Sequence, residues 1–513
     1  MQQKNNNHSA KKTADKYASG VKSQKSKYLK TILKRSKVRN TNNLFYRGLV
    51  PKFFISWLIA LFTVALMAGL AFGQGNFTQS GVGAVTNTGT LVIKGTAAFG
   101  AQTTVGGTVD YAKAGPSQSI ADVDYNNLTL SGGAGSLKAF PNADVAIAGN
   151  LTLSGGVVKA DVNARPGTSA VINYNGGTQA VAAIDYQGLT FSAAGTKTFA
   201  AGVTKIAGSF TLTAGTADAT ANATTLEFDG TGAQTLAAIN YDNLSITGTR
   251  AATPAITLAS GIIGIKSAFT VSPINPVTYV TTGNAVNYNG TLAQTITAFN
   301  YNDLTTSATR GTNNITLASS GTIGVFGAFN PTATFAGGGY VVTGSTINYN
   351  GLTGQSIIGG ATFPLYENLT ISGSGTKAAS GAIALNAAGV LNNSVTFNMG
   401  TSSLTFTAAP SNSGTVQFAG LDNGRAVGSA AGIVEYDGAI AQNVLAGTYF
   451  HLMFTNGSAL AQKTIAGAVT AANNLTVNAT GFLTVSGTGA VQINNDLINT
   501  GAITNAGTVT VGL

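Results

Sequence analysis

The chain contains an internal repeat of about 60 residues, and this repeat restricts the possible folds more than any other feature, because such periods are typical of repeat architectures. One clear copy reads YNGTLAQTITAFNYNDLT at 288–305. Each copy holds a first aromatic residue, a glutamine, a second aromatic residue and a leucine. The six copies are Tyr111, Gln118, Tyr125 and Leu128; Tyr174, Gln179, Tyr186 and Leu189; Phe228, Gln234, Tyr241 and Leu244; Tyr288, Gln294, Tyr301 and Leu304; Tyr349, Gln355, Tyr366 and Leu369; and Tyr436, Gln442, Tyr449 and Leu452.

The spacing of these positions is regular. Successive first aromatic residues are 63, 54, 60, 61 and 87 residues apart, and the second aromatic residue precedes the leucine by 3 in every copy. The longest step implies an insertion near 380–430, which contains a degenerate copy around Phe418. Architectures of this kind grow by stacking similar units.

The sequence after residue 75 predicts strands and no amphipathic helix. Short segments such as 128–131 and 151–154 alternate apolar and polar residues, and Gly, Asn and Ser clusters separate them. Near the C-terminus, Leu497, Ile503 and Val509 recur every six residues, as expected for successive coils. We therefore predict an all-β, right-handed parallel β-solenoid, with about three coils of about 20 residues in each repeat. The alternative is a series of tandem small β-sandwich modules.

The predicted organisation has five parts. They are a basic disordered tail at 1–52; a signal peptide h-region or transmembrane helix at 53–73; an N-terminal cap or start of the β region at 74–107; the repeats at 108–432, with the insertion near 380–430; and the last repeat with short-period coils at 433–513.

The repeated aromatic residues and glutamines are predicted to be structural. Residues on either side of a strand residue share the opposite face, and those beside the first aromatic are polar, as in Asn287 and Asn289. The ring should therefore point into the core, where stacked aromatics and a glutamine ladder would fix the register of neighbouring coils. The alternative is an exposed aromatic platform for sugars. The uneven Tyr-x-x-Leu step also predicts a bend or bulge between those two residues.

The net charge of +10 comes from the N-terminal tail. Residues 1–52 carry +13, whereas the remaining 461 residues carry −3, so nucleic-acid binding is not expected for the body. An uncharged apolar run follows at 53–72, and small residues follow it, which predicts a secretory signal cleaved between Gly73 and Gln74. The same run is long enough to remain as a transmembrane anchor, and either reading places the repeats outside the membrane.

The sequence contains few residues of the types used in catalysis. There is no cysteine, and His8 and His451 are the two histidines, so we predict no catalytic residue, metal site or cofactor. The candidate carboxylates for a β-helical lyase or hydrolase are Asp122/Asp124, Asp185, Glu227/Asp229 and Glu435/Asp437. Other copies carry Asn at equivalent positions, which argues against a dedicated catalytic pair.

Several fragments resemble the repeats of bacterial cell-surface and adhesin-like proteins, broadly of the filamentous-haemagglutinin β-helix type. They are YNGTLAQT at 288–295, YNNLTLSG at 125–132, NLTISGSGTK at 368–377 and AGNLTLSGG at 148–156. The resemblance covers 108–513 and implies export, a structural or adhesive role, and no cofactor.

We therefore expect a secreted or cell-surface, non-enzymatic repeat rod. The expected partners are cell-surface or extracellular polymers, including glycans, and other copies of the chain joined end to end through unpaired strand edges. Contact with a membrane is expected only through 53–73 if this segment is retained. The alternatives are a carbohydrate-binding surface module and a β-helical polysaccharide lyase or hydrolase.

Overall fold

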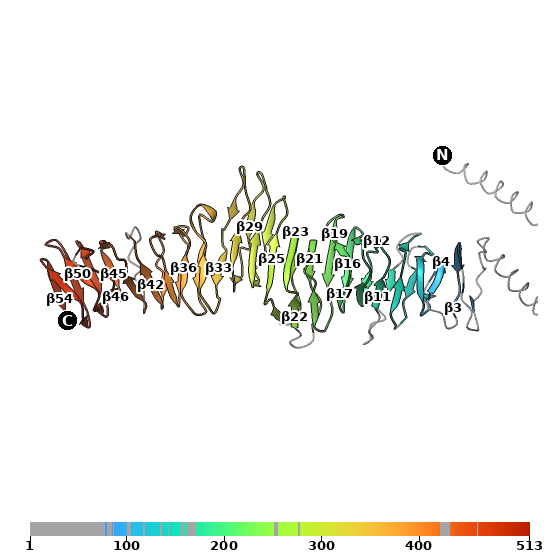
Figure 1. Cartoon of the computed structure of the whole chain (residues 1–513), viewed down its shortest axis with the longest axis horizontal. Coiled ribbons are helices and arrows are strands. Elements are labelled where there is room, and N and C mark those ends of the chain that lie inside the picture. Colours follow the sequence, from blue (N-terminus) through green and yellow to red (C-terminus); the bar gives the residue numbers. More distant parts are fainter. Residues whose placement is uncertain are drawn as a thin grey trace, which may run out of the picture. The chain divides into compact units, whose positions relative to one another are not determined.

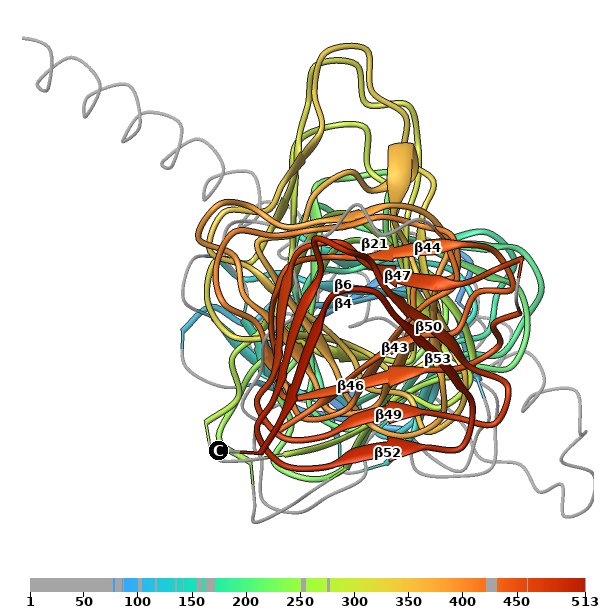
Figure 2. The same ribbon diagram turned by 90° about the vertical axis from the view of Figure 1, so that its left-hand side faces the viewer.

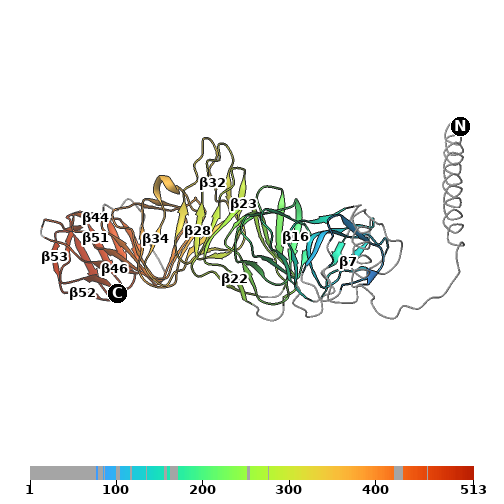
Figure 3. The same cartoon turned by 45° about the vertical axis from the view of Figure 1, so that its right-hand side comes forward.

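The computed structural model describes residues 77–78, 85, 87–99, 104–115, 118–133, 136–141, 143–154, 159–161, 171–250, 255–274, 277–420, 431–458 and 460–512. The predicted tail at 1–52, the apolar segment at 53–73 and the Gly73–Gln74 cleavage site lie outside these residues. In the described residues the chain forms a parallel β-solenoid of about 18 stacked coils, which confirms the predicted solenoid and excludes the sandwich modules. Strands of successive coils lie side by side (Figures 1 and 3).

Two long sheets form most of the first half of the solenoid. Their strand pairings are parallel, and each strand pairs with strands from the coils before and after it. One sheet contains β2(Thr90–Ile93), β4(Thr104–Tyr111), β6(Asp124–Leu130), β8(Val145–Ile147), β11(Val171–Tyr174), β14(Gly188–Phe191) and β17(Phe210–Leu212). The other contains β5(Gln118–Ser119), β7(Leu137–Ala139), β10(Lys159–Asp161), β13(Asp185–Tyr186), β16(Gly202–Ile206), β19(Thr224–Phe228), β21(Asn240–Ile246), β23(Gly261–Val271), β25(Asn284–Tyr288), β28(Asp303–Thr306) and β31(Phe329–Pro331).

Four further sheets continue the same stacking to the end of the described chain (Figure 2). The first contains β27(Asn300–Tyr301), β30(Ile323–Val325), β33(Thr346–Tyr349), β35(Asn368–Ile371), β38(Leu391–Asn393) and β41(Ser411–Asn412). The second contains β34(Gln355–Ile357), β36(Lys377–Ala379), β39(Thr396–Asn398), β42(Thr415–Phe418), β43(Ile433–Tyr436), β46(His451–Phe454), β49(Leu475–Val477) and β52(Leu497–Asn499). The last two contain β44(Gln442–Val444), β47(Lys463–Ile465), β50(Phe482–Val485) and β53(Ala502–Asn505), and β45(Gly447–Tyr449), β48(Ala468–Ala471), β51(Ala490–Ile493) and β54(Thr508–Val511).

The coils vary in length, and a repeat is not a whole number of coils. Tyr174 pairs with Phe191 in the next coil, whereas Tyr301 pairs with Val325, so the coil that begins at Tyr301 is the longer one. Val325 in turn pairs with Tyr349, so the second aromatic of one repeat lies two coils below the first aromatic of the next. Tyr349 therefore lies in the same column as Tyr301 and not in that of Tyr288. This repeat does not consist of three coils of about 20 residues, because the two coils between Tyr301 and Tyr349 are longer than that.

The insertion near 380–430 supplies an additional coil of the solenoid. Phe418 is buried and pairs with Tyr436, the first aromatic of the last repeat. The same ladder joins β42 to β43 across the predicted boundary at 432/433. In the region predicted as a cap, β2 pairs with β4, so residues 90–93 already belong to the stacked strands.

Alternation of inward and outward side chains builds the core. In β19 and β25 the buried positions are every second residue, and an apolar core of Ile, Leu, Val, Phe and Tyr runs through the coils. The predicted bulge is confirmed in β21, where the pairing with β23 shifts between Tyr241 and Asn243. This shift allows both Tyr241 and Leu244 to point inward although an odd number of steps separates them.

Candidate functional site

All 24 repeated positions are buried, with no side chain more than 8% exposed. Of the second aromatic residues, Tyr186 and Tyr241 are fully buried and Tyr301 is 1% exposed. The structure thus confirms that these residues belong to the core, and it contradicts an exposed platform built from these tyrosines. Any ligand-binding surface must use other residues.

The two tyrosines of a repeat form a closed chain of hydrogen bonds. Thr297 N–H donates to the Tyr288 hydroxyl, and the Tyr301 hydroxyl donates to the carbonyl oxygen of the same Thr297. The two hydroxyls are 2.8 Å apart, so the remaining Tyr288 proton lies between them. The other four Tyr–Tyr pairs repeat this arrangement around Ala121, Ala182, Ile358 and Leu445, with hydroxyl–hydroxyl distances of 2.8, 2.8, 3.0 and 3.3 Å.

The Phe228 repeat lacks this pair, because Phe228 has no hydroxyl. Tyr241 still donates to the carbonyl of Ala237 at 2.8 Å. Burial raises the pKa of the buried tyrosines, for example to about 12 for Tyr174 and Tyr349. These hydroxyls therefore remain protonated, as their donor roles require.

Each glutamine joins its own turn to the coil below. Gln294 Oε1 accepts from Gly290 N–H at 3.0 Å, and Nε2 donates to the carbonyls of Ile265 and Ser267 at 2.8 and 3.2 Å. The glutamines bond to backbone groups and not to one another, so the predicted glutamine ladder is wrong. Their contacts with the coil below are consistent with the predicted role in fixing the register, which stays a prediction. Glycine is required in this turn because a Cβ at Gly290 would lie 1.9 Å from the Lys266 carbonyl oxygen.

A buried cation accompanies every glutamine. The six residues are Lys138, Lys197, Arg250, Arg310, Lys377 and Lys463, and none is more than 2% exposed. The four lysines lie directly opposite the glutamine in the next coil, as in the Gln355–Lys377 pair. Arg250 and Arg310 lie in the loop before the strand that pairs with the glutamine strand. Their longer side chains still reach the glutamine.

Backbone carbonyls surround these cations, and Lys138, Arg250 and Arg310 also donate to the glutamine. Arg310 donates to Gln294 Oε1 at 2.5 Å, to the Tyr288 carbonyl at 2.7 Å and to the Leu292 carbonyl at 2.9 Å. Lys377 Nζ donates to the carbonyls of Gly351 and Thr353, both at 2.7 Å. Burial lowers the pKa of these cations, and Lys138 falls to about 8. Sequence reasoning missed this set, although the fragment SGSGTK contains one member, Lys377.

The candidate carboxylates act as hydrogen-bond acceptors on the outer face. The residue before the first aromatic accepts from a hydroxyl of the next coil in all six copies. The pairs are Asp110–Ser131, Asn173–Ser192, Glu227–Thr247, Asn287–Ser307, Asn348–Ser372 and Glu435–Thr455, at 2.6 to 2.9 Å. Because an amide and a carboxylate oxygen both accept such a bond, Asn and Glu exchange freely here.

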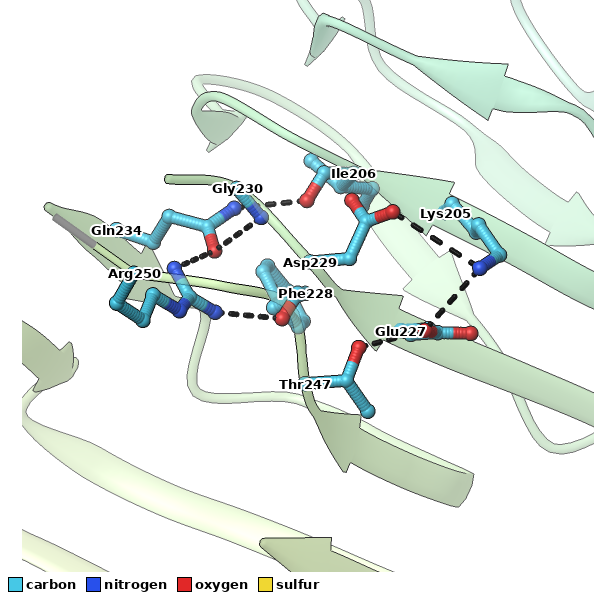
Figure 4. A network of polar contacts seen from close by, with 9 residues as sticks. All are labelled: Lys205, Ile206, Glu227, Phe228, Asp229, Gly230, Gln234, Thr247 and Arg250. Atoms are coloured by element: carbon cyan, nitrogen blue, oxygen red, sulfur yellow. Dashed lines mark hydrogen bonds and ion pairs between the residues drawn. The ribbon is translucent and has the colours of Figure 1, made fainter. Parts of the chain in front are cut away.

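One group of these acids is brought together with a cation. Lys205 lies opposite Asp185 and Glu227 in the strand register, and its Nζ is 3.2 Å from Glu227 and 3.9 Å from Asp229 (Figure 4). The Lys205 side chain is 37% exposed, so this is a surface ion pair. We call Asp185, Lys205, Glu227 and Asp229 the filled junction, since they lie where one repeat meets the next.

The other candidates lie apart from this group in the chain. Asp124 accepts from the Ala146 N–H, and Asp122 is exposed. Burial, and then the charge of Glu435, raises the pKa of Asp437.

His451 is half-buried at the start of β46, with its ring 4.7 Å from that of Phe450. Equivalent residues bond to the backbone, as Asn368 does to the Ser345 carbonyl.

Within the part of the chain that the structure describes, no group of three or more His, Cys, Asp and Glu side chains is placed to hold a metal ion. No helix among the described residues is both long and apolar enough to cross a membrane.

Comparisons with family models, with curated proteins and with solved structures gave no significant match to this chain.

Proposed function

We propose that the protein is an exported, non-enzymatic structural or adhesive protein of a bacterial surface, which makes multivalent contacts with extracellular polymers. One observation carries the proposal: the repeated residues are all inside the solenoid, so the repeat specifies a scaffold and not a series of identical active sites. A stacked scaffold presents similar outer surfaces several times, and several weak contacts can then sum to a strong attachment.

The outer surface supports the same proposal. Its carboxylates exchange with asparagine between copies and accept the same hydroxyl bond. An enzyme that used two carboxylates would need them at a set separation in one copy. Export rests on the order of the basic tail, the apolar run and the small residues at 1–74.

Two measurements on the full chain test this proposal. Cell fractionation with determination of the N-terminal residue should place the protein outside the cytoplasm, beginning at Gln74. Intact peptides from 1–52 in the exported form would show that the segment at 53–73 is retained as an anchor. Recovery of the chain in the cytoplasm would contradict export.

The second measurement is a screen of the purified protein for cleavage of polysaccharides, which should find none. Turnover that disappears in Asp229→Asn or Asp437→Asn but persists in the control Asp122→Asn would establish an enzyme and contradict the proposal.

A further inference from the structure

The junction between repeats recurs one repeat later with very different side chains. In the filled junction the three register partners in successive coils are Asp185, Lys205 and Glu227. One repeat later the corresponding partners are Asn240, Gly264 and Asn287. Asn289 follows the first aromatic, as Asp229 does. We call Asn240, Gly264, Asn287 and Asn289 the open junction.

Glycine at 264 lets two asparagine amides meet on the outer face, and a hollow lies beside them. Asn289 Nδ2 donates to Asn240 Oδ1 at 3.2 Å across the intervening coil. A Cβ at Gly264 would lie 1.9 Å from Asn240 Oδ1 and 2.7 Å from Asn289 Nδ2, so the two amides meet only because this residue is glycine. A hollow of about 260 Å³, lined in part by Asn240, Lys266 and Asn289, lies here and is open to solvent. This volume is near the lower end of small-molecule sites, about 300 Å³.

The polar groups of the hollow are amides, hydroxyls and one ammonium. Each asparagine offers a carbonyl acceptor and an NH₂ donor, and Thr220 and Thr291 also line the hollow. Lys266 Nζ donates to the Thr220 carbonyl at 2.8 Å, which leaves two of its protons for a ligand. Hydrogen bonds from Thr220, and to a smaller extent the positive charge of Lys266, lower the pKa of the Asp218 carboxyl.

We propose that the open junction binds one unit of a neutral saccharide through vicinal hydroxyls. A pair of adjacent hydroxyls presents donors and acceptors side by side, which matches the donor and acceptor of an asparagine amide. The side chains that line the hollow are mostly amides and hydroxyls with a single ammonium, which favours a neutral unit over a phosphate or a carboxylate. This inference rests on the proposed function, and it names a site and a ligand class for the multivalent contacts.

A second open junction lies in the following repeat, formed by Asn300, Gly324, Asn348 and Asn350. A Cβ at Gly324 would lie 2.1 Å from Asn300 Oδ1 and 3.2 Å from Asn350 Nδ2. Asn350 Oδ1 is buried, and no hydrogen-bond donor reaches it among the described residues. Phe326 takes the place of Lys266, with 46% of its surface exposed. An exposed ring beside amide groups suits the apolar face and the polar edge of a sugar ring.

The test is calorimetric titration of the full chain with neutral oligosaccharides of glucose, galactose and mannose, and separately with an oligogalacturonide. We expect saturable binding of at least one neutral oligosaccharide at two sites. Gly264→Lys, which copies Lys205 of the filled junction, should remove one site. Asn289→Ala should weaken that site by about tenfold, the effect of about 1.4 kcal/mol. Asn300→Ala with Asn350→Ala should remove the other site.

The matched control is Asn330→Ala, which removes an exposed asparagine from the middle of β31 and should leave binding unchanged. Circular dichroism and thermal unfolding check that every variant is folded. Absence of binding to all neutral oligosaccharides, binding of the oligogalacturonide alone, or unchanged binding in Gly264→Lys and Asn289→Ala would each overturn the inference. None of these results bears on export, whereas recovery of a saccharide-binding chain in the cytoplasm would contradict the proposed function alone.

Discussion

Lys205 and Gly264 occupy the same register position in successive repeats, one coil below the residue that precedes the first aromatic residue of a repeat. Around Lys205 the neighbours are acids that form an ion pair, and around Gly264 they are asparagines that border a hollow. Beneath both junctions the interior is almost the same: a glutamine bonded to the coil below and to an arginine, Arg250 or Arg310.

The difference shows which positions the fold requires and which it leaves free. Inside, the glutamine and the arginine are buried, so a change of residue leaves a buried group without a partner. Outside, water can replace any lost contact, so residues change at little cost in stability. The outer face is therefore where copies of the repeat can acquire different binding properties.

The largest effect is expected from removing the glutamine at either junction. Gln234→Leu and Gln294→Leu each leave a buried arginine and several backbone groups short of a partner. Each buried group left without a partner costs about 1–3 kcal/mol, and a charged group costs more. Because a solenoid unfolds locally, hydrogen exchange of the adjacent coils is the suitable measurement.

Both glutamine variants should lose a similar amount of protection, since the two interiors are alike. The control Gln492→Leu changes a glutamine on the outer side of β51 and should stay within about 0.5 kcal/mol. A large loss at one junction with none at the other would show that the interiors differ in a way that the contacts do not reveal.

A smaller effect is expected from the tyrosine hydroxyls, where the two repeats do differ. Tyr288→Phe removes an acceptor for Thr297 N–H and a donor for Tyr301, and it should cost about 1–2 kcal/mol. In the repeat with Phe228 the first aromatic residue already lacks a hydroxyl. Tyr241→Phe there removes a single hydrogen bond and should lower the free energy of unfolding by less. Urea or thermal unfolding of the two variants measures the difference. An equal loss for both would mean that the Tyr288–Tyr301 contact adds nothing.

The repeats should differ in how their stability depends on pH, because some of the buried cations are lysines and others are arginines. Burial lowers the pKa of Lys138 from 10.5 to about 8. Between these values the unfolded chain binds more protons than the folded one, so the free energy of unfolding of that coil rises with pH. Arg250 and Arg310 stay protonated in this range, so their coils should show no such rise.

Above about pH 10, tyrosines ionise in the unfolded chain, whereas Tyr174 stays protonated in the folded chain. The free energy of unfolding therefore falls as the pH rises further.

Thermal unfolding from about pH 8 to pH 10 measures the expected rise, and Lys138→Arg should reduce it. Part of the rise should remain, because burial also lowers the pKa of Lys197, Lys377 and Lys463. A flat profile in the native chain would show that Lys138 keeps its proton throughout this range in the folded chain, as a hydrated ammonium would.

The sequence predicted the burial of the repeated residues because alternation along a strand is a local property. Tyr301 and Gln294 are buried as expected, and the bulge after Tyr241 follows from the odd-numbered step to Leu244. The buried cations were missed because lysine and arginine are usually exposed, and because Lys377 meets Gln355 only through the stacking of one coil on the next.

The open junction could not be predicted from the sequence for the same reason. Asn240 and Asn289 are 49 residues apart, and their contact depends on two coils of different length. Stacking places the second aromatic residue of one repeat below the first aromatic residue of the next repeat. Equivalent positions of successive repeats therefore do not lie above one another. A periodic pattern specifies which residues face inward, but it does not specify which outward residues become neighbours.

The smallest effect is expected from the ion pair of the filled junction. Lys205→Ala removes an exposed partner, and exposed ion pairs contribute about 0–1 kcal/mol, less at high salt. Glu227→Gln should be nearly neutral as well, because a glutamine oxygen can still accept from Thr247, as Asn287 does from Ser307. Thermal unfolding at low and high salt measures both variants, with Asp122→Asn as a control on an exposed acid. A loss of several kcal/mol from either change would mean that these acids belong to the buried framework, and the division between a fixed interior and a free outer face would no longer hold at this junction.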